Sequence, residues 1–182
     1  MSIASVAPDL TTGTWNIDPA HSEVTFVIRH LMTKVRGTFT EFSGTIEIAE
    51  DLGRSKATAE VKMASIDTRN AERDAHIKTA DVLDVEKYPT MTFTSTGVRA
   101  EDGEHYLDGD LTIKGVTRPV SFRVEYNGVG EDPWGGTRAG FSAETTINRK
   151  DWGIEFNIPL KGEKALLSDK VDIQLEIQAV RA

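Results

Sequence analysis

The chain has 182 residues, of which 21 are Lys or Arg and 29 are Asp or Glu, so its net charge at pH 7 is −8. This acidic balance argues against a nucleic-acid-binding protein, which would show a basic stripe. The absence of cysteine excludes disulfides, thiolate chemistry and zinc–cysteine sites. No apolar run approaches the ~20 residues of a membrane-spanning helix, so we expect no integral membrane segment.

The N-terminal residues 1–13 are small and polar, and they predict a flexible arm in front of one domain formed by residues 14–182. This arm shows neither the basic n-region nor the apolar h-region of a signal peptide. A cytoplasmic protein is therefore expected, with an exported mature form as the alternative.

Most of the chain alternates apolar and polar residues, the period of two that is typical of strands with one buried face. The pattern begins at Trp15, and a shift of register between Phe39 and Phe42 predicts a bulge or bend. It breaks between Ser65 and Pro89, where a short helix over about 70–79 is expected, and again over residues 149–169. Turn signals separate the later strands at Asp102-Gly103, Lys114-Gly115 and Asn127-Gly128.

Eight main strands without crossover helices predict an all-β protein, either a sandwich or a closed barrel. In an up-and-down antiparallel barrel, one end collects the turns near Asp51, Asp102 and Gly130 and the segment from Asp18 to His21. The other end collects residues 30–34, 65–89, 114–118 and 149–169. Because the long connections fall at this second end, we expect the mouth of the barrel there, with the helix beside it. This end also carries most of the clustered cations, namely Lys34, Arg69, Arg73, Lys78, Lys114, Arg118, Arg149, Lys150, Lys161 and Lys164.

Catalytic signatures such as a nucleophile elbow or a phosphate-binding loop are absent. A metal site of His30 and His76 with Asp74 or Asp151 is the weaker alternative to solvated or structural histidines, so no metal is expected. The acid–histidine–serine run from Asp18 to Ser22 is interpreted as an Asx-type turn, because residues so close in one turn seldom converge for catalysis.

The segment Arg149-Lys150-Asp151-Trp152-Gly153 leaves two interpretations open. An Arg–Asp pair could pin the loop. Alternatively, Trp152 and Phe156 could cover an apolar ligand while Arg149 meets its head group.

An ordered set of short motifs resembles the YceI family of polyisoprenoid-binding proteins. The motifs are Asp18-Pro19-Ala20-His21-Ser22 with Phe26 and His30, Gly37 with Phe42 and Gly44, Ser65-Ile66-Asp67-Thr68, Tyr88-Pro89 with Phe93, the run from Gly109 to Thr117, and Arg149-Lys150-Asp151-Trp152-Gly153. The resemblance runs from about Trp15 to the C-terminus. It implies an eight-stranded, lipocalin-like antiparallel barrel whose lumen holds a long isoprenoid or similar lipid, without catalysis.

We therefore expect a non-catalytic protein that binds, stores or transports a long-chain isoprenoid, its pyrophosphate or quinone form, or a related apolar lipid, with no other cofactor. The residues expected to line the lumen are Val24, Phe26, Ile28, His30, Phe42, Ile46, Val61, Met63, Phe93, Leu111, Ile113, Val120, Phe122, Val124, Phe141, Ile147, Trp152, Phe156, Ile173 and Leu175. The head-group candidates are Lys114, Arg149 and His76. Small inward residues (Gly44, Ala57, Ala59, Ser95, Gly109, Ala139 and Ala143) favour an open lumen over a packed one.

Two other functions stay open at this point. One is a barrel enzyme that acts on an apolar substrate at the mouth through His30, His76 or Arg149. The other is a packed barrel that serves as an interaction module on its charged outer surface. A homodimer is also an open alternative.

Overall fold

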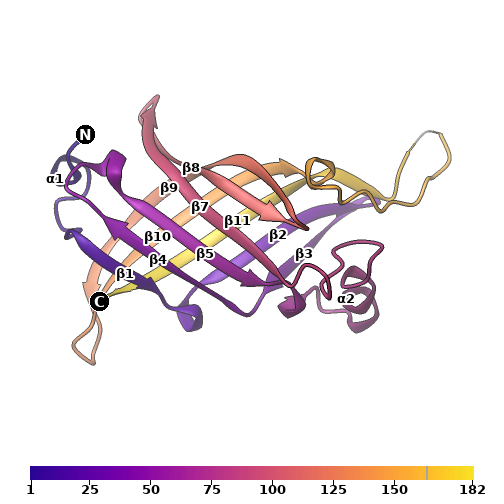
Figure 1. Cartoon of the computed structure of the whole chain (residues 1–182), viewed down its shortest axis with the longest axis horizontal. Coiled ribbons are helices and arrows are strands. Elements are labelled where there is room, and N and C mark those ends of the chain that lie inside the picture. Colours follow the sequence, from indigo (N-terminus) through magenta and orange to yellow (C-terminus); the bar gives the residue numbers. More distant parts are fainter. Residues whose placement is uncertain (163) are drawn as a thin grey trace.

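A computed structural model describes residues 1–162 and 164–182 and shows a closed antiparallel β-barrel (Figure 1). Over these residues the strands are β1 (Gly13–Ile17), β2 (Glu23–His30), β3 (Thr33–Phe39), β4 (Phe42–Ile48), β5 (Lys56–Lys62), β6 (Ile66–Asp67), β7 (Thr90–Glu101), β8 (Glu104–Ile113), β9 (Val116–Glu131), β10 (Thr137–Asn148) and β11 (Leu167–Arg181). The α-helices are α1 (Ile3–Val6) and α2 (Ala71–Ile77), and the 3₁₀ helices are η1 (Pro19–His21), η2 (Leu52–Arg54), η3 (Met63–Ser65) and η4 (Arg149–Trp152). None of the described helices is long and apolar enough to cross a membrane.

These strands fill eight positions around the barrel, because several of them are halves of one interrupted strand. Both β1 and β2 pair with β11, at opposite parts of its length, and η1 lies between them. The strands β3 and β4 follow each other with only Thr40 and Glu41 between, at the bend predicted from the register shift. Likewise, β5 and β6 are separated only by η3 and pair with β4 and β3, so that the eleven described strands make eight positions. Pairing of Trp15 with Arg181 joins β1 to β11 and closes the barrel. The expected eight-stranded, lipocalin-like barrel is confirmed.

Two of the three predicted turns are tight hairpins. Asp102 and Gly103 connect β7 to β8, Lys114 and Gly115 connect β8 to β9, and all four residues have positive φ. Two successive residues with positive φ form the type I′ turn that matches the twist of a hairpin. The third prediction, a turn at Asn127-Gly128, is wrong. This dipeptide lies inside β9, opposite a register shift in β10, so its glycine serves a bulge rather than a chain reversal.

One end of the barrel, which we call the helix end, carries α2 and is filled with side chains. The predicted helix is confirmed, and Asn70 caps it by accepting the Arg73 N–H at 3.0 Å. Leu83, from the segment after α2, and Trp152, from η4, are buried in the core at this end. Other members of this core are Phe39, Val61, Met63, Ile66, Leu111, Ile113, Val120 and Phe122. The mouth expected here is therefore a packed closure, because the long connections fold inward and bury their apolar residues.

The opposite end, which we call the terminal end, carries both chain termini (Figure 1). Here the expected flexible arm is instead packed against the barrel. Ile3, Ala7 and Leu10 are buried and form a second core with Trp15 and residues from the neighbouring strands. The arm thus belongs structurally to the barrel domain.

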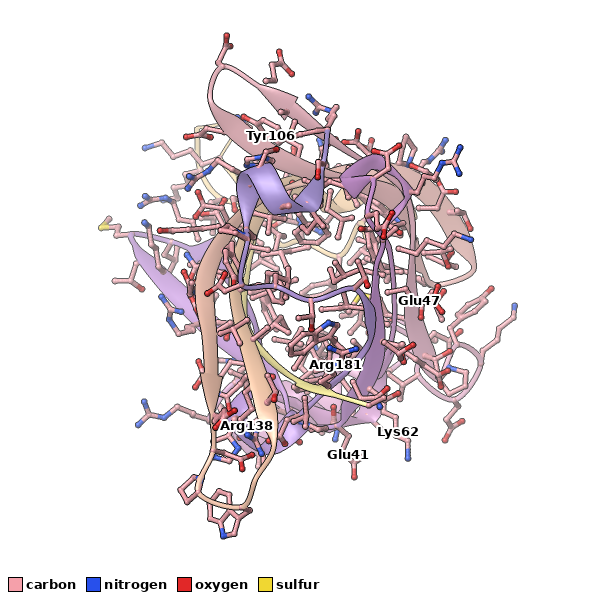
Figure 2. The ribbon with its side chains drawn as sticks, turned by 90° about the vertical axis from the view of Figure 1, so that its left-hand side faces the viewer. Glu41, Glu47, Lys62, Tyr106, Arg138 and Arg181 are labelled. Atoms are coloured by element: carbon pink, nitrogen blue, oxygen red, sulfur yellow. The ribbon has the colours of Figure 1, made fainter. Side chains whose placement is uncertain are left out.

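An ion cluster on the outer wall joins the interruption between β1 and β2 to β10. Arg138 donates from Nη1 to Asp18 Oδ2 at 2.7 Å and from Nε to Asp132 Oδ2 at 2.8 Å (Figure 2 labels Arg138). Asp18 also accepts the Ala20 N–H, which confirms the predicted Asx-type turn. His21 Nδ1 lies 2.8 Å from Asp18 Oδ2 on the exposed outer surface. The hydrogen bond from Arg138, followed by that from His21, lowers the pKa of Asp18 to about 2.

This pKa predicts how the stability of the barrel depends on pH. Because the pKa of Asp18 is lower in the folded than in the unfolded chain, its stabilisation is full above about pH 4 and is lost as pH falls toward about 2. We expect Asp18→Asn to cost about 1–2 kcal/mol at pH 7. The difference in melting temperature between wild type and variant should shrink between pH 4 and pH 2. A difference that stays constant over this range would contradict the assignment.

Candidate functional site

An apolar cavity of about 250 Å³ lies inside the barrel, toward the terminal end. Its wall is built by inward-facing residues of β4, β5, β7, β8, β9, β10 and β11, and the N-terminal arm forms part of the lining. Figure 2 looks onto this end along the barrel. The cavity therefore extends from the N-terminal arm to Val61, Met91 and Leu111, beside the packed core that closes the end where the sequence predicted a mouth.

Small residues in the wall keep the lumen open at this level. Ala57, Ala59 and Ala143 line the cavity, as their inward positions predicted. At Gly109 a Cβ would collide with the ring of Phe93, so the absence of a side chain lets that ring lie against the wall. Phe93 also packs edge to face on Phe122, with ring centroids 5.5 Å apart. These residues create room where larger side chains would fill the barrel.

The N-terminal arm roofs the cavity. Ile3, Val6, Ala7 and Leu10 contribute to its lining. The arm is held by backbone hydrogen bonds at the β4–β5 connection, where the Ile3 N–H donates to the Glu50 carbonyl and the Leu52 N–H donates to the Met1 carbonyl, both at 2.8 Å. The arm therefore forms a fixed part of the cavity wall at this end.

A polar contact fixes the other side of the arm. The Tyr126 hydroxyl donates to Asp9 Oδ1 at 2.7 Å. Burial, with a further contribution from the Asp9 carboxylate, raises the pKa of Tyr126, so the phenol stays protonated and remains a donor. Tyr126, His105 and Lys56 line the cavity, so polar groups lie at the edge of a lining that is mostly apolar.

The structure brings together about half of the residues predicted to line the lumen. Those that line the cavity are Val24, Phe42, Ile46, Val61, Phe93, Leu111, Phe122, Val124, Phe141, Ile173 and Leu175. Phe26, Met63, Ile113, Val120, Ile147 and Trp152 instead belong to the packed core at the helix end. Ile28, His30 and Phe156 are not part of the cavity lining either. The alternation identified the inward face correctly, but it could not show at which height the barrel is filled.

The three head-group candidates lie at the helix end and do not line the cavity. Lys114 Nζ is 3.5 Å from the Gly153 carbonyl oxygen. His76 packs edge-on against the Phe156 ring, with centroids 4.7 Å apart, and its Nε2 lies 3.4 Å from Asp81. Each of these side chains contacts the connections that close this end. In the described part of the chain, no three His, Asp or Glu residues are grouped so that they could hold a metal ion.

Arg149, the third candidate, is buried and holds the loop that follows it. Its Nε donates to the Ser168 carbonyl at 2.9 Å, and its Nη1 donates to the carbonyls of Ile154 and Phe156 at 2.7 and 2.9 Å. Trp152 is buried beside it and donates from Nε1 to the Leu111 carbonyl at 3.0 Å. Of the two interpretations left open for this segment, these contacts favour a pinned loop, although Arg149 holds it through backbone carbonyls and the carboxylate near it is that of Asp169, at 3.9 Å.

A substitution separates a structural from a ligand-binding Arg149. Because three carbonyls would lose a charged donor, we expect Arg149→Ala to lower the free energy of unfolding by about 3 kcal/mol. If the lumen holds the expected apolar lipid, its affinity in the folded fraction should stay within about threefold of wild type. Chemical denaturation and ligand titration of the same sample measure both quantities. A large loss of affinity with unchanged stability would assign Arg149 to the ligand instead.

Several lining residues were not among the predicted site residues. The arm residues Ile3, Val6, Ala7 and Leu10 lie outside any strand pattern, but their spacing of three, one and three is the repeat of one helical face. That spacing was the available signal for a packed segment. His105, Leu107 and Tyr126 follow the inward alternation of β8 and β9 and could have been found by extending it to the strand ends.

A family model described as a YceI-like domain matches residues 15–179. The chain belongs to the YceI-like family. It is 42% identical over 163 residues to Protein YceI of Escherichia coli O157:H7, which covers 88% of this chain and 82% of that protein. A UPF0312 protein of Pseudomonas putida (strain W619) is 44% identical over 166 residues with the same coverage.

Solved structures show the same fold. The YceI protein of Campylobacter jejuni superposes with a TM-score of 0.71 at 29% identity, covering 83% of this chain and 87% of that one. A polyisoprenoid binding domain from Saccharophagus degradans, described as implicated in plant cell wall breakdown, gives a TM-score of 0.70 at 14% identity, covering 94% and 100%. The YceI-like match begins at Trp15, so the arm that roofs the cavity lies outside it.

Proposed function

We propose that this YceI-like protein binds a long-chain isoprenoid or a related apolar lipid inside its barrel, and stores or carries it without catalysing a reaction. The observation that carries the proposal is the apolar cavity inside the barrel, whose lining comes mainly from aliphatic and aromatic side chains. The likeness in fold to a domain that is described as polyisoprenoid-binding supports the class of ligand.

Apolar contact is the main source of affinity in this proposal. Burying about 500 Å² of hydrocarbon contributes about 12 kcal/mol at ~25 cal/mol per Å². Loss of translational and rotational freedom offsets several kcal/mol or more of this, which leaves micromolar to nanomolar binding. Polar contacts of the head group then contribute mainly to specificity.

The polar rim suggests how the ligand is oriented. His105 and Tyr126 stand at the terminal end of the cavity, beneath the arm. The apolar chain would extend from there between Phe93, Phe122 and Phe141. A neutral head group that accepts hydrogen bonds, such as a quinone or an alcohol, fits this rim, where the Asp9 carboxylate opposes the attraction of an anion by Lys56.

The small volume of the cavity implies that the arm moves when a long chain binds. Its volume of about 250 Å³ is just below the ~300–1,000 Å³ that is usual for small-molecule sites. A long chain therefore needs space that Ile3, Val6 and Leu10 now occupy. The proposal consequently includes displacement of the arm during loading.

Calorimetric titration with a matched series of ligands tests the proposal. A long prenol, a prenylated quinone, a prenyl pyrophosphate and a fatty acid should be compared after the protein has been stripped of lipid. We expect one-to-one binding with a negative heat-capacity change, tightest for the neutral isoprenoids. No binding of any of the four would exclude the lumen as a lipid site.

A further inference from the structure

Three large apolar side chains are exposed together at the helix end. Leu31 and Met32 form the turn between β2 and β3 and are 51% and 90% exposed, and Ile158 in the segment before β11 is 47% exposed. In Figure 1 the β2–β3 turn and the loop before β11 both lie at the side of the barrel that carries α2. We call these three residues, together with the cations Arg29, Lys34, Lys161, Lys164 and Lys170, the basic tip.

Backbone hydrogen bonds hold the two segments side by side. The Leu31 N–H donates to the Leu166 carbonyl at 2.9 Å, and the Leu166 N–H donates to the Ile158 carbonyl at 3.0 Å. The three exposed side chains therefore come from adjacent backbone segments at one end of the barrel. None of them contributes to the cavity lining.

The turn keeps its apolar residues at an energetic cost. Leu31 has a φ of 54°, a left-handed conformation that disfavours residues with a branched, bulky side chain. Two-residue hairpin turns normally place Gly, Asn or Asp at such a position. A strained and exposed leucine contributes nothing to a core, so its presence indicates a role outside the fold.

Exposed cations flank the exposed apolar residues along the same chain segments, which also carry Glu155 and Asp169. Arg29, Lys34, Lys161, Lys164 and Lys170 are exposed, and within the described ranges none of them forms an ion pair. This local charge contrasts with the net charge of −8 of the whole chain. Exposed apolar side chains bordered by lysines have the composition of surfaces that insert into the boundary between lipid head groups and acyl chains.

We propose that the basic tip docks on an anionic lipid bilayer. Leu31, Met32 and Ile158 enter the interface, and the lysines contact anionic head groups. In this orientation the N-terminal arm and the cavity lie at the far end of the barrel from the bilayer. The surface is therefore a tether, and it acts independently of whether the lumen holds a lipid.

Flotation of the full-length protein with vesicles tests this proposal. We expect binding to vesicles of phosphatidylcholine with 30% phosphatidylglycerol, release at high salt, and no binding to phosphatidylcholine alone. Such vesicles contain no isoprenoid, so filling of the lumen with its proposed ligand cannot cause co-flotation. Failure to bind the anionic vesicles would overturn the proposal and would leave the lumen proposal untouched.

Two variants locate the contact. The double variant Leu31→Gly with Met32→Ser removes the apolar tip while it relieves the positive φ, so it should lose vesicle binding and keep or raise the melting temperature. Lys161→Ala with Lys164→Ala should weaken binding roughly 30-fold, given the usual contribution of a lysine near an anionic surface. Trp134→Ser is the matched control, because Trp134 is 81% exposed but belongs to the β9–β10 connection at the terminal end. Equal binding by the Leu31/Met32 variant and the wild type would contradict the assignment.

Discussion

Phe141→Asp is expected to abolish retention of an apolar lipid in a barrel that still folds. Phe141 lines the cavity and is only partly buried, and it packs on Tyr126 with ring centroids 5.7 Å apart. A carboxylate there would have to be desolvated by the hydrocarbon chain without gaining a partner. We expect at least a roughly 100-fold loss of affinity, measured by titration against a prenylated quinone.

A matched variant controls for the added charge. Thr94→Asp places the same carboxylate on the exposed outer face of β7, next in sequence to the cavity residue Phe93, and should bind lipid like the wild type. If Phe141→Asp fails to fold, Ala143→Leu tests the same claim with an apolar side chain. It fills the cavity, so it should keep or raise the melting temperature while it excludes long chains. Normal lipid binding by a folded Ala143→Leu or Phe141→Asp protein would contradict a ligand site in this lumen.

Removal of residues 1–10 is expected to change the rates of lipid exchange more than any single substitution. The arm lines the cavity, and in the proposed mode of loading it is displaced when a long chain enters. We expect the truncated protein to take up and release lipid at least tenfold faster than the wild type, because the barrier of arm opening is gone. Stopped-flow fluorescence with a prenyl-tailed dye measures both rates. The free energy of unfolding should fall by roughly 3–5 kcal/mol, since the truncated protein lacks the burial of Ile3 and Leu10 against the barrel.

Tyr126→Phe should weaken the attachment of the arm without removing the arm. It removes only the hydroxyl that donates to Asp9 and leaves the ring and the arm in place. Loss of this hydrogen bond should raise the open population, and hence the uptake rate, by up to about tenfold. Exchange rates that are unchanged in both proteins would show that lipid enters by another route.

Strand positions and barrel class could be predicted from sequence because a period of two is a local property. Each segment such as Val171 to Ala179 shows its buried face by itself, and eight of them without crossover helices indicate a sandwich or a closed barrel, between which the resemblance to the YceI family favoured the barrel. The bend between Phe39 and Phe42 was visible for the same reason. In contrast, Asn127-Gly128 has the composition of a turn, and only its pairing with β10 shows that it is a bulge.

The level of the cavity could not be predicted, because it depends on which connections fold inward. Long loops suggested a mouth, yet Leu83 and Trp152 from these loops are buried and close the helix end. The arm seemed too small and polar to pack, yet Ile3, Ala7 and Leu10 share one face and cover the terminal end. Both outcomes have the same physical cause, because apolar side chains in irregular segments are also driven out of water. The alternation of apolar and polar residues does not detect such segments.

The most direct test of the central claim is native mass spectrometry of the freshly purified, full-length protein, followed by organic extraction of any bound molecule. We predict a one-to-one adduct with the mass of an isoprenoid lipid, which disappears in Ala143→Leu. A protein that carries no adduct, and that takes up neither prenols nor prenylated quinones after incubation, would contradict lipid binding in the lumen.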